Sequence, residues 1–251
     1  MNIVLLNKKS RNSTVIKFKN DVPYISYKAM DEIPWLTHGF STRIGGVSQG
    51  VLSSMNLGFG RGDLEENVVN NHKIIANAIG FESKNIVCSK QTHTKNVVFS
   101  TYFAVFVPLY MVDVKNKAIG LSHSGWRGTV GKIGACTLKK MKENYGTDSK
   151  DVIACIGPSI CMSCYEISED VANEFKMAFP DNIDNILLNK GNGKYMLDLW
   201  ECNRIVFREC GVLEENIHLP DICTCCNDKM LFSHRATNGK RGNLAAFLEI
   251  K

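Results

Sequence analysis

The stretch Ser122-His123-Ser124-Gly125-Trp126-Arg127-Gly128 marks the junction between a predicted strand and a predicted helix. The apolar residues 117–121 before it are typical of a strand, and residues 129–145 after it are typical of a helix. Its glycines let the backbone approach a ligand closely, and the start of a helix presents unpaired N–H groups. These features indicate a site for an anionic ligand, with Arg127 at the helix entrance. A structural, hydrogen-bonded His123 explains the same heptapeptide equally well.

The composition is that of an ordinary globular protein. Hydrophobic residues make up 44% of the 251 residues and charged residues 22%, so the chain can bury a sizeable core. The net charge of +5 is spread over scattered lysines and arginines, which gives no support for nucleic-acid binding. No apolar run has the length of a membrane span, and the N-terminus shows neither the basic region nor the cleavage site of a signal peptide. We therefore expect a cytoplasmic protein with no nucleic-acid or membrane partner; its oligomeric state does not follow from the sequence.

Strands and helices are predicted to alternate along the chain. Residues 15–18 and 24–27 predict two strands with a turn at Asn20-Asp21, and Asp63 is expected to cap a helix that continues to Ala78. The apolar run 103–112 predicts one buried strand. Further strands are predicted at 152–156 and 244–250, and further helices at 168–178 and 197–210. The pattern favours one α/β (α+β) domain over residues 1–251, with layered mixed β-sheets flanked by helices.

The cysteines gather in two local clusters. The chain has ten of them, and the clusters read Cys161-Met162-Ser163-Cys164 and Cys223-Thr224-Cys225-Cys226. Two pairs of cysteines with a gap of two residues suggest a four-cysteine zinc site. A disulfide framework is not expected in a chain without a secretion signal. Reduced, mostly buried thiols are the simpler interpretation of both clusters.

Arg43 lies just before Gly45-Gly46, after a predicted strand that begins at Trp35. Its side chain is placed to reach a ligand from a loop, although a solvent-facing arginine beside a turn is an equally good interpretation. A second glycine-rich loop, residues 56–62, lacks the spacing and the lysine of a phosphate-binding P-loop. No nucleotide site of the P-loop kind is therefore predicted.

Five motifs, taken in order along the chain, resemble those of the YfiH family. They are His38-Gly39-Phe40-Ser41-Thr42-Arg43-Ile44-Gly45-Gly46, Gln91-Thr92-His93, His123-Ser124-Gly125-Trp126-Arg127-Gly128, Ile156-Gly157-Pro158-Ser159-Ile160 with Tyr165-Glu166, and Phe232-Ser233-His234-Arg235. The family carries an older label, multicopper polyphenol oxidoreductase or laccase-like protein, and is now assigned to purine nucleoside phosphorolysis. The resemblance extends from Trp35 to the C-terminus, and it implies a single-domain α/β fold.

The resemblance also implies a chemistry. It implies a zinc ion held by two histidines and one cysteine, with copper as the alternative metal of the older label. It implies phosphorolysis of adenosine, inosine and methylthioadenosine with some adenosine deamination, so a purine nucleoside and inorganic phosphate are the expected partners. The matching histidine ligands are His93 and His123. Arg43 and Arg127 are expected to grip phosphate or orient the ribose, since guanidinium groups match oxyanions, and Gln91 is expected to hydrogen-bond the substrate.

The third metal ligand departs from the family pattern. Where the family has Ala-Asp-Cys-Val-Pro, this chain reads Ala104-Val105-Phe106-Val107-Pro108, so Phe106 occupies the position of the cysteine ligand. The segment between His93 and this run is also shorter than in the family. A phenyl ring has no lone pair to donate, which leaves two ligands where catalytic zinc sites keep three. We expect low zinc occupancy and impaired activity unless Cys88, otherwise a buried thiol, replaces the missing ligand.

Three functions remain open from the sequence. The first is a purine nucleoside phosphorylase, active or impaired, and the second is a catalytically inactive nucleoside-binding protein, which the change at Phe106 favours. The third, a copper-dependent polyphenol oxidase, is weaker because a multicopper centre needs many histidines and the chain has six. No glutamate is convincingly placed as the acid–base group that adenosine deamination requires.

Overall fold

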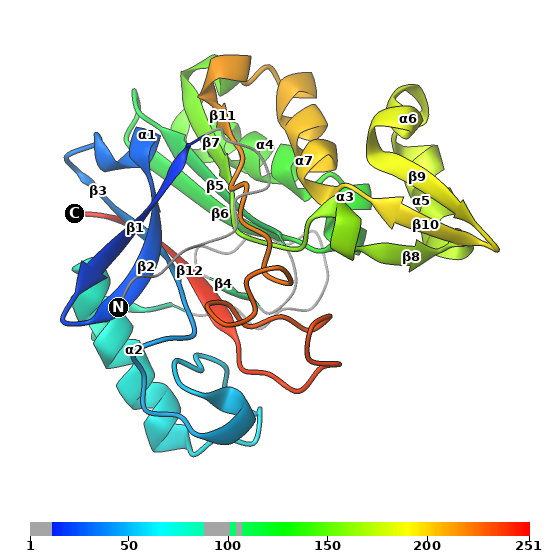
Figure 1. Ribbon diagram of the computed structural model, residues 1–251. Coiled ribbons are helices and arrows are strands. Elements are labelled where there is room, and N and C mark those ends of the chain that lie inside the picture. Colours follow the sequence, from blue (N-terminus) through cyan, green and yellow to red (C-terminus); the bar gives the residue numbers. More distant parts are fainter. Residues whose placement is uncertain (1–11, 88–100, 104–106) are drawn as a thin grey trace.

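A five-stranded antiparallel sheet brings early and late parts of the chain together (Figure 1). The structure is a computed structural model that describes residues 12–87, 101–103 and 107–251. The strands, in sheet order, are β1 (Thr14–Lys19), β2 (Val22–Tyr27), β3 (Leu36–Ser41), β12 (Leu244–Ile250) and β4 (Thr101–Phe103). Asn20 and Asp21 adopt left-handed backbone (φ 50° and 61°), as the tight turn between β1 and β2 requires. The predicted turn and both of its strands are confirmed.

A second, mixed sheet of four strands packs against the first. Its order is β11 (Ile217–His218), β7 (Val152–Ile156), β5 (Val107–Asp113) and β6 (Ala118–Ser124). The β11–β7 pair is parallel, and the other two pairs are antiparallel. The facing sides of the two sheets share one apolar cluster, in which Tyr27 and Phe40 of the first sheet meet Tyr110 of the second. The Tyr110 hydroxyl donates to Gly39 O at 3.1 Å, so its polar end is satisfied within the core.

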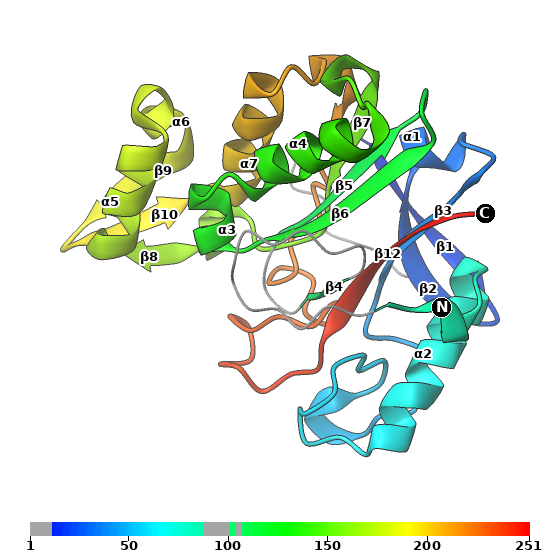
Figure 2. The same ribbon diagram turned by 180° about the vertical axis from the view of Figure 1, so that it is seen from behind.

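Helices cover the outer faces of both sheets, as Figures 1 and 2 show from opposite sides. Helix α2 (Glu65–Ile79) packs on the first sheet through the cluster that contains Ile75, and α4 (Ile133–Tyr145) and α7 (Leu199–Glu209) pack on the second sheet. Beside these layers lies a three-stranded sheet, in the order β8 (Glu166–Ser168), β10 (Lys194–Leu197) and β9 (Leu187–Gly191). The remaining helices are α1 (Lys28–Asp31), α3 (Trp126–Val130), α5 (Glu169–Ala178) and α6 (Ile183–Ile186). Short 3-10 helices lie at Gly50–Leu52, Ser83–Asn85, Ser149–Asp151, Met162–Cys164, Pro180–Asn182 and Glu214–Asn216.

The predicted single strand over residues 103–112 is wrong. The run contributes to two strands in two different sheets: β4 pairs with β12, and β5 lies between β6 and β7. Hydrophobicity alone cannot show this crossing, because strands of both sheets are apolar where they face the shared core. Pro108 is the second residue of β5, and its carbonyl accepts a hydrogen bond from Gly157 N at 2.7 Å.

Two local predictions about helices also need correction. The predicted helix over residues 129–145 is divided into α3 and α4, because Lys132 between them has a left-handed backbone (φ 50°). The N-cap of α2 is Leu64, not Asp63. The Asp63 carboxylate instead accepts hydrogen bonds from Leu64 N at 3.0 Å and from Ser48 Oγ at 2.6 Å. Asp63 therefore ties the preceding loop to the helix start.

The mixed α/β class with several sheets and flanking helices is confirmed. That residues 1–251 form one domain stays a prediction. In the described part of the chain, every helix is too short or too polar to cross a bilayer.

Candidate functional site

His123 and Arg127 lie on either side of the junction between β6 and α3. His123 is the next-to-last residue of β6, opposite Pro108 of β5, and its Nε2 atom is buried. Arg127 is exposed, with its Cζ 4.2 Å from the centre of the Trp126 ring. Gly128 lies close beneath the strand end: a Cβ at this position would come within 3.0 Å of the His123 carbonyl oxygen. A strand, a glycine junction and a helix follow one another as predicted, although the helix begins at Trp126 and not at Thr129. Gly128 allows this helix to begin directly against the histidine.

A buried hydroxyl network fixes this junction. Ser124 Oγ donates to Asn203 Oδ1 of α7 at 2.7 Å and lies 2.9 Å from Thr129 Oγ1. Thr129 N donates to Gly125 O at 2.7 Å, which closes the first turn of α3. All three polar side chains are buried, so breaking the network leaves desolvated groups unpaired. The network holds the last residues of β6, including His123, in a fixed position relative to α3.

Arg43 is half-buried and is engaged in contacts within the protein. Its Nε and Nη2 donate to Ser53 O at 2.9 and 2.8 Å, and its Nη1 donates to Asp228 O at 2.9 Å. Its Cζ lies 4.6 Å from the centre of the Phe232 ring, and burial lowers its pKa. Since a guanidinium has five N–H groups, these three hydrogen bonds leave two N–H groups with which Arg43 can bind an anion. Arg43 therefore joins two loops and keeps part of its hydrogen-bonding capacity for a ligand.

The two glycines after Arg43 are required by the path of the backbone. Gly45 has a φ of 89°, a conformation that favours glycine. At Gly46, an added Cβ would come within 2.3 Å of Ser54 O and 2.5 Å of Asn71 Oδ1. The loop that carries Arg43 is thus packed tightly against the chain at Ser54.

Three arginines are close enough to His234 to affect its charge; with His234 we call them the basic cluster, and they are Arg61, Arg235 and Arg241. Arg235 also donates from Nη2 to Glu166 O at 2.9 Å. Burial, followed by the charges of Arg241, Arg61 and Arg235, lowers the pKa of His234. Burial and then the charge of Arg61 lower the pKa of Arg241 to about 10. Each positive charge makes its neighbours harder to protonate, and an anion among them would relieve this repulsion.

Arg241 is the most deeply placed member of the basic cluster. It is 5% exposed, and its Nη1 donates to Gly242 O at 3.0 Å and to Asn243 Oδ1 at 2.6 Å. Within the residues that the structure describes, its buried Nε has no hydrogen-bond acceptor. A buried, unpaired N–H on a charged group is costly, and an oxyanion is the ligand that would satisfy it.

Asparagine side chains hold the two loops of the basic cluster together. Asn56 Oδ1 accepts from Asn243 N and from Gly58 N, both at 3.0 Å, and Leu57 N donates to Asn243 O at 3.0 Å. An added Cβ at Gly242 would come within 2.7 Å of the Phe232 ring, the ring that lies against Arg43. The motif that contains Arg43 and the basic cluster therefore share a neighbour, the Phe232 ring.

Arg61, His234, Arg235 and Arg241 were not among the predicted site residues. The local signals were the motif Phe232-Ser233-His234-Arg235, which matched the family without giving a role, and two arginines beside glycines, Arg61-Gly62 and Arg241-Gly242. The contact between these segments depends on hydrogen bonds between residues far apart in the sequence, which no local pattern reveals.

Three of the predicted site residues, Gln91, His93 and Phe106, lie outside the described residues, and so does Cys88. Arg43 follows β3 of the first sheet, whereas His123 and Arg127 belong to the end of β6 in the second. That these residues act on one ligand stays a prediction.

Two other histidines have structural roles. His38 Nε2 accepts from Tyr27 N at 3.0 Å, and burial lowers the pKa of His38 to about 4. His72 Nε2 donates to Leu57 O at 3.0 Å, and its ring stacks on that of Phe59. These two of the six histidines are bound to backbone groups of the first sheet and of the 56–62 loop.

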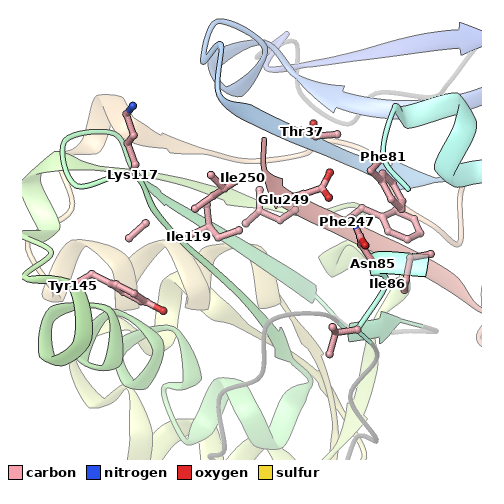
Figure 3. Close-up of a pocket in the computed structure, with 13 residues that line it drawn as sticks. Thr37, Phe81, Asn85, Ile86, Lys117, Ile119, Tyr145, Phe247, Glu249 and Ile250 are labelled. Carbon is pink, nitrogen blue, oxygen red and sulfur yellow. The ribbon is translucent and has the colours of Figure 1, made fainter. Parts of the chain in front are cut away.

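An apolar cavity of about 340 Å³ lies at the edge where β12 and β6 meet the segment after α2 (Figure 3). The residues that line it include Phe81, Phe247 and Ile119, together with the charged Lys117 and Glu249. None of Arg43, Arg127 and His123 lines this cavity. These three predicted site residues thus lie outside the cavity.

Comparison with known proteins identifies relatives along most of the chain. A family model described as "Multi-copper polyphenol oxidoreductase laccase" matches residues 37–105 and 94–251. The protein named purine nucleoside phosphorylase YlmD of Bacillus subtilis is 31% identical over 245 residues, which cover 85% of this chain and 88% of the relative. A purine nucleoside phosphorylase of Bacteroides thetaiotaomicron is 28% identical over 268 residues, with coverage of 94% and 99%.

Two solved structures have the same fold. The YfiH protein of Bacillus licheniformis superposes with a TM-score of 0.88 at 25% identity, covering 94% of this chain and 99% of the other. YlmD of Geobacillus stearothermophilus gives the same TM-score at 26% identity, with coverage of 95% and 99%. The alignment with the B. subtilis relative is 245 positions long, but it includes only 85% of the 251 residues of this chain. The relative therefore has residues within the alignment that have no counterpart in this chain. The two pieces of the family match overlap over residues 94–105, where the sequence analysis expects the shortened segment.

Proposed function

The chain belongs to the YfiH family, whose model carries the multicopper polyphenol oxidoreductase description, and from this we propose that it is a purine nucleoside phosphorylase. Relatives that cover most of the chain bear that name. The proposed substrates are a purine nucleoside, with adenosine, inosine and methylthioadenosine as candidates, and inorganic phosphate. The protein is proposed to act as a glycosyltransferase in the cytoplasm.

The observation that carries the proposal is the basic cluster. Arg241 is buried, its Nε has no acceptor among the described residues, and Arg61 adds positive charge beside it. A neutral polyphenol has no negative charge for these groups to bind, whereas inorganic phosphate presents several anionic oxygens to a guanidinium. Arg43, which contacts the Phe232 ring next to this cluster, extends the positive surface. The site is therefore suited to a phosphate co-substrate.

The reaction needs the phosphate to be held and the base to leave. An oxygen of phosphate bonds to the anomeric carbon while the bond from that carbon to the purine nitrogen breaks, through a transition state with oxocarbenium character. The purine keeps the electron pair of the broken bond and takes up a proton, and ribose 1-phosphate is the second product. Arg43, Arg127 and the basic cluster would position phosphate and partly neutralise it, so that attack does not require free diffusion of a highly hydrated anion.

The donor set does not fit the zinc ion that the resemblance implies. His93 and His123 supply two nitrogen ligands, and the third position holds Phe106, which has no donor atom. We derive no step through a metal at this site, and we propose that the loss of this ligand impairs the enzyme. Adenosine deamination, which in zinc deaminases relies on metal-activated water, is correspondingly not expected to be a major activity.

The second candidate function is a nucleoside-binding protein without turnover, because the Phe106 position removes a ligand but leaves Arg43, Arg127 and the basic cluster in place. A polyphenol oxidase is weaker, since His38 and His72 are committed to backbone hydrogen bonds and are not available to a copper centre.

The decisive assay incubates the purified full-length chain with inosine, with and without inorganic phosphate. We expect hypoxanthine and ribose 1-phosphate in equal amounts, formed only when phosphate is present. Free ribose formed without phosphate would show a hydrolase instead. Tight binding of inosine with no product in either condition would establish the binding protein, and a parallel reaction with adenosine reports deamination as released ammonia.

A further inference from the structure

Four cysteines from two distant segments meet at one point of the structure. They are Cys161 and Cys164, around the 3-10 helix Met162–Cys164, and Cys223 and Cys226, in the segment after β11. All four sulfur atoms lie within 4.8 Å of one another, and the Cys164 and Cys226 sulfurs are 3.5 Å apart. None of the four forms a disulfide with another described residue. We call this group the cysteine site.

The fold itself brings the two segments together. Strands β7 and β11 are parallel neighbours, so the segments that leave their carboxyl ends emerge side by side. A parallel bridge joins Ser159 to Cys223, with Ser159 N donating to Ile222 O at 3.4 Å and Thr224 N donating to Ser159 O at 3.1 Å. The Trp200 indole N–H donates to Ser159 Oγ at 2.6 Å and anchors the bridge to α7. The two cysteine pairs are thus aligned by backbone contacts that do not involve the thiols.

Backbone N–H groups point at one of the sulfurs. Cys161 N and Cys226 N donate to Cys223 Sγ at 3.3 and 3.4 Å. Hydrogen bonds of this kind stabilise negative charge on sulfur and are the usual surroundings of a metal-bound thiolate. Four neutral thiols at these distances stabilise one another only weakly, whereas the binding of a metal cation by four thiolates is strongly favourable.

The spacing fits a tetrahedral metal ion. With Zn–S bonds of about 2.3 Å, the sulfurs of a tetrahedral site are separated by about 3.8 Å. The Cys164 and Cys226 sulfurs are 3.5 Å apart and no two of the four are more than 4.8 Å apart, so small side-chain adjustments suffice. Each pair also has the two-residue gap typical of structural zinc sites. Cys161 and Cys223 are buried, whereas Cys164 and Cys226 are half-buried, which leaves a side from which an ion can enter.

We propose that Cys161, Cys164, Cys223 and Cys226 bind a structural Zn²⁺ ion that clamps the segment after β7 to the segment after β11. Because all four ligands come from the protein, the site has no open position for a substrate. The zinc ion would stabilise the loop that follows Cys226. Asp228 O accepts from Arg43 Nη1 and Met230 O accepts from Arg43 N, both at 2.9 Å, so the zinc site fixes the loop that anchors Arg43.

Zinc content separates this site from the family's histidine site. We would measure zinc per chain by elemental analysis in the wild-type protein, the Cys164→Ser/Cys226→Ser variant, and two controls. Cys225→Ser removes a half-buried neighbour that is not in the cysteine site, and His123→Asn removes a ligand of the histidine site. We expect about one zinc per chain in the wild type and both controls, and close to none in the double variant, because it keeps only two of the four thiolate ligands. Zinc retained in the double variant, or lost in His123→Asn instead, would overturn the proposal.

A measurement on the unmodified protein guards against variants that fail to fold. The wild-type chain, reduced and stripped of metal, is reconstituted with Zn²⁺ and examined by X-ray absorption, with Co²⁺ as a spectroscopic probe. We expect four sulfur ligands at about 2.3 Å and the charge-transfer bands of a tetrahedral tetrathiolate. Nitrogen in the shell, failure to take up zinc, or a disulfide between Cys164 and Cys226 found by mass spectrometry would each contradict the assignment. These outcomes do not depend on whether the protein cleaves nucleosides.

Discussion

The guanidinium of Arg43 lies against the ring of Phe232, with Cζ 4.6 Å from the ring centre. This contact joins two motifs that are far apart in the sequence, His38–Gly46 and Phe232–Arg235. The same arginine donates to Ser53 O and Asp228 O, so three loops converge on one side chain. Arg43 is therefore both an organiser of the site and, by our proposal, part of its phosphate-binding surface.

Replacing Arg43 or Arg127 by alanine should separate these two roles. Arg127→Ala removes an exposed side chain stacked on Trp126, so the free energy of unfolding should change by only about 0.5 kcal/mol. Arg43→Ala removes the partners of two backbone carbonyls and should cost roughly 1–3 kcal/mol. Both changes should raise the KM for phosphate. Urea unfolding and phosphate titrations check this, and a KM unchanged in both variants would remove these arginines from the site.

Arg241→Gln tests the basic cluster. The change removes a buried charge that Arg61 repels, so stability should change little while the KM for phosphate rises about tenfold or more. Arg208→Gln, on the exposed side of α7, is the matched control and should leave both quantities unaltered. If Arg241→Gln lowers the melting temperature sharply and leaves the KM alone, Arg241 is a structural residue only.

Gly46→Ala should destabilise the loop that carries Arg43. An added Cβ meets Ser54 O at 2.3 Å, and backbone cannot move away as a flexible side chain can. We expect a loss of about 1–3 kcal/mol in the free energy of unfolding, as for other overpacked sites. Gly60→Ala is a useful comparison, because a Cβ there meets nothing within 4 Å and only its φ of 69° opposes the change. Equal effects of the two substitutions in chemical denaturation would show that the space at Gly46 is not limiting.

His38 should make the protein less stable in mild acid. Burial lowers its pKa in the folded state from 6.5 to about 4, with Asp31 opposing and Lys17 assisting the shift. Between these two pH values the unfolded chain binds a proton that the folded chain does not, so stability is present above pH 6.5 and falls as the pH drops towards 4. At roughly 1.4 kcal/mol per pH unit, the loss amounts to about 3 kcal/mol.

The check is the pH dependence of the free energy of unfolding for the wild type and for His38→Asn. Burial also lowers the pKa values of His72 and His218, so both proteins should lose stability in acid. The variant should lose less between pH 6.5 and 4. Parallel curves for the two proteins would exclude His38 as a source of the acid sensitivity.

Much of the fold was predictable because its signals are local. The alternation before and after Asn20-Asp21 gave the β1–β2 hairpin, and the short apolar run at 152–156 gave β7 with the observed bounds. The crossing between β4 and β5 was not predictable, since apolar residues do not show which sheet they enter. Nor was the break at Lys132, where one left-handed residue divides a continuous helical pattern.

The same distinction between local patterns and contacts between distant segments applies to the sites. The strand–glycine–helix junction at His123 and Gly128 was visible in seven consecutive residues. The basic cluster depends on Asn56 and Asn243 joining two loops, and the cysteine site depends on β7 and β11 being neighbours. Such pairings are decided by the packing of the whole molecule. The spacing of the cysteines suggested a four-cysteine site as one alternative, whereas no local pattern indicated that the 56–62 loop would meet the segment before β12.

We propose that this chain is a phosphorylase whose family metal site lacks one donor at Phe106. The direct measurement is the difference between Phe106→Cys and the wild type in zinc per chain and in phosphate-dependent formation of ribose 1-phosphate from inosine. Any zinc bound at the cysteine site is present in both proteins and therefore cancels when their zinc contents are compared. We predict additional zinc in the variant, approaching one ion per chain, and faster turnover than the slow, phosphate-dependent reaction of the wild type. Equal zinc and equal turnover in the two proteins, or no phosphate-dependent product from either, would contradict it.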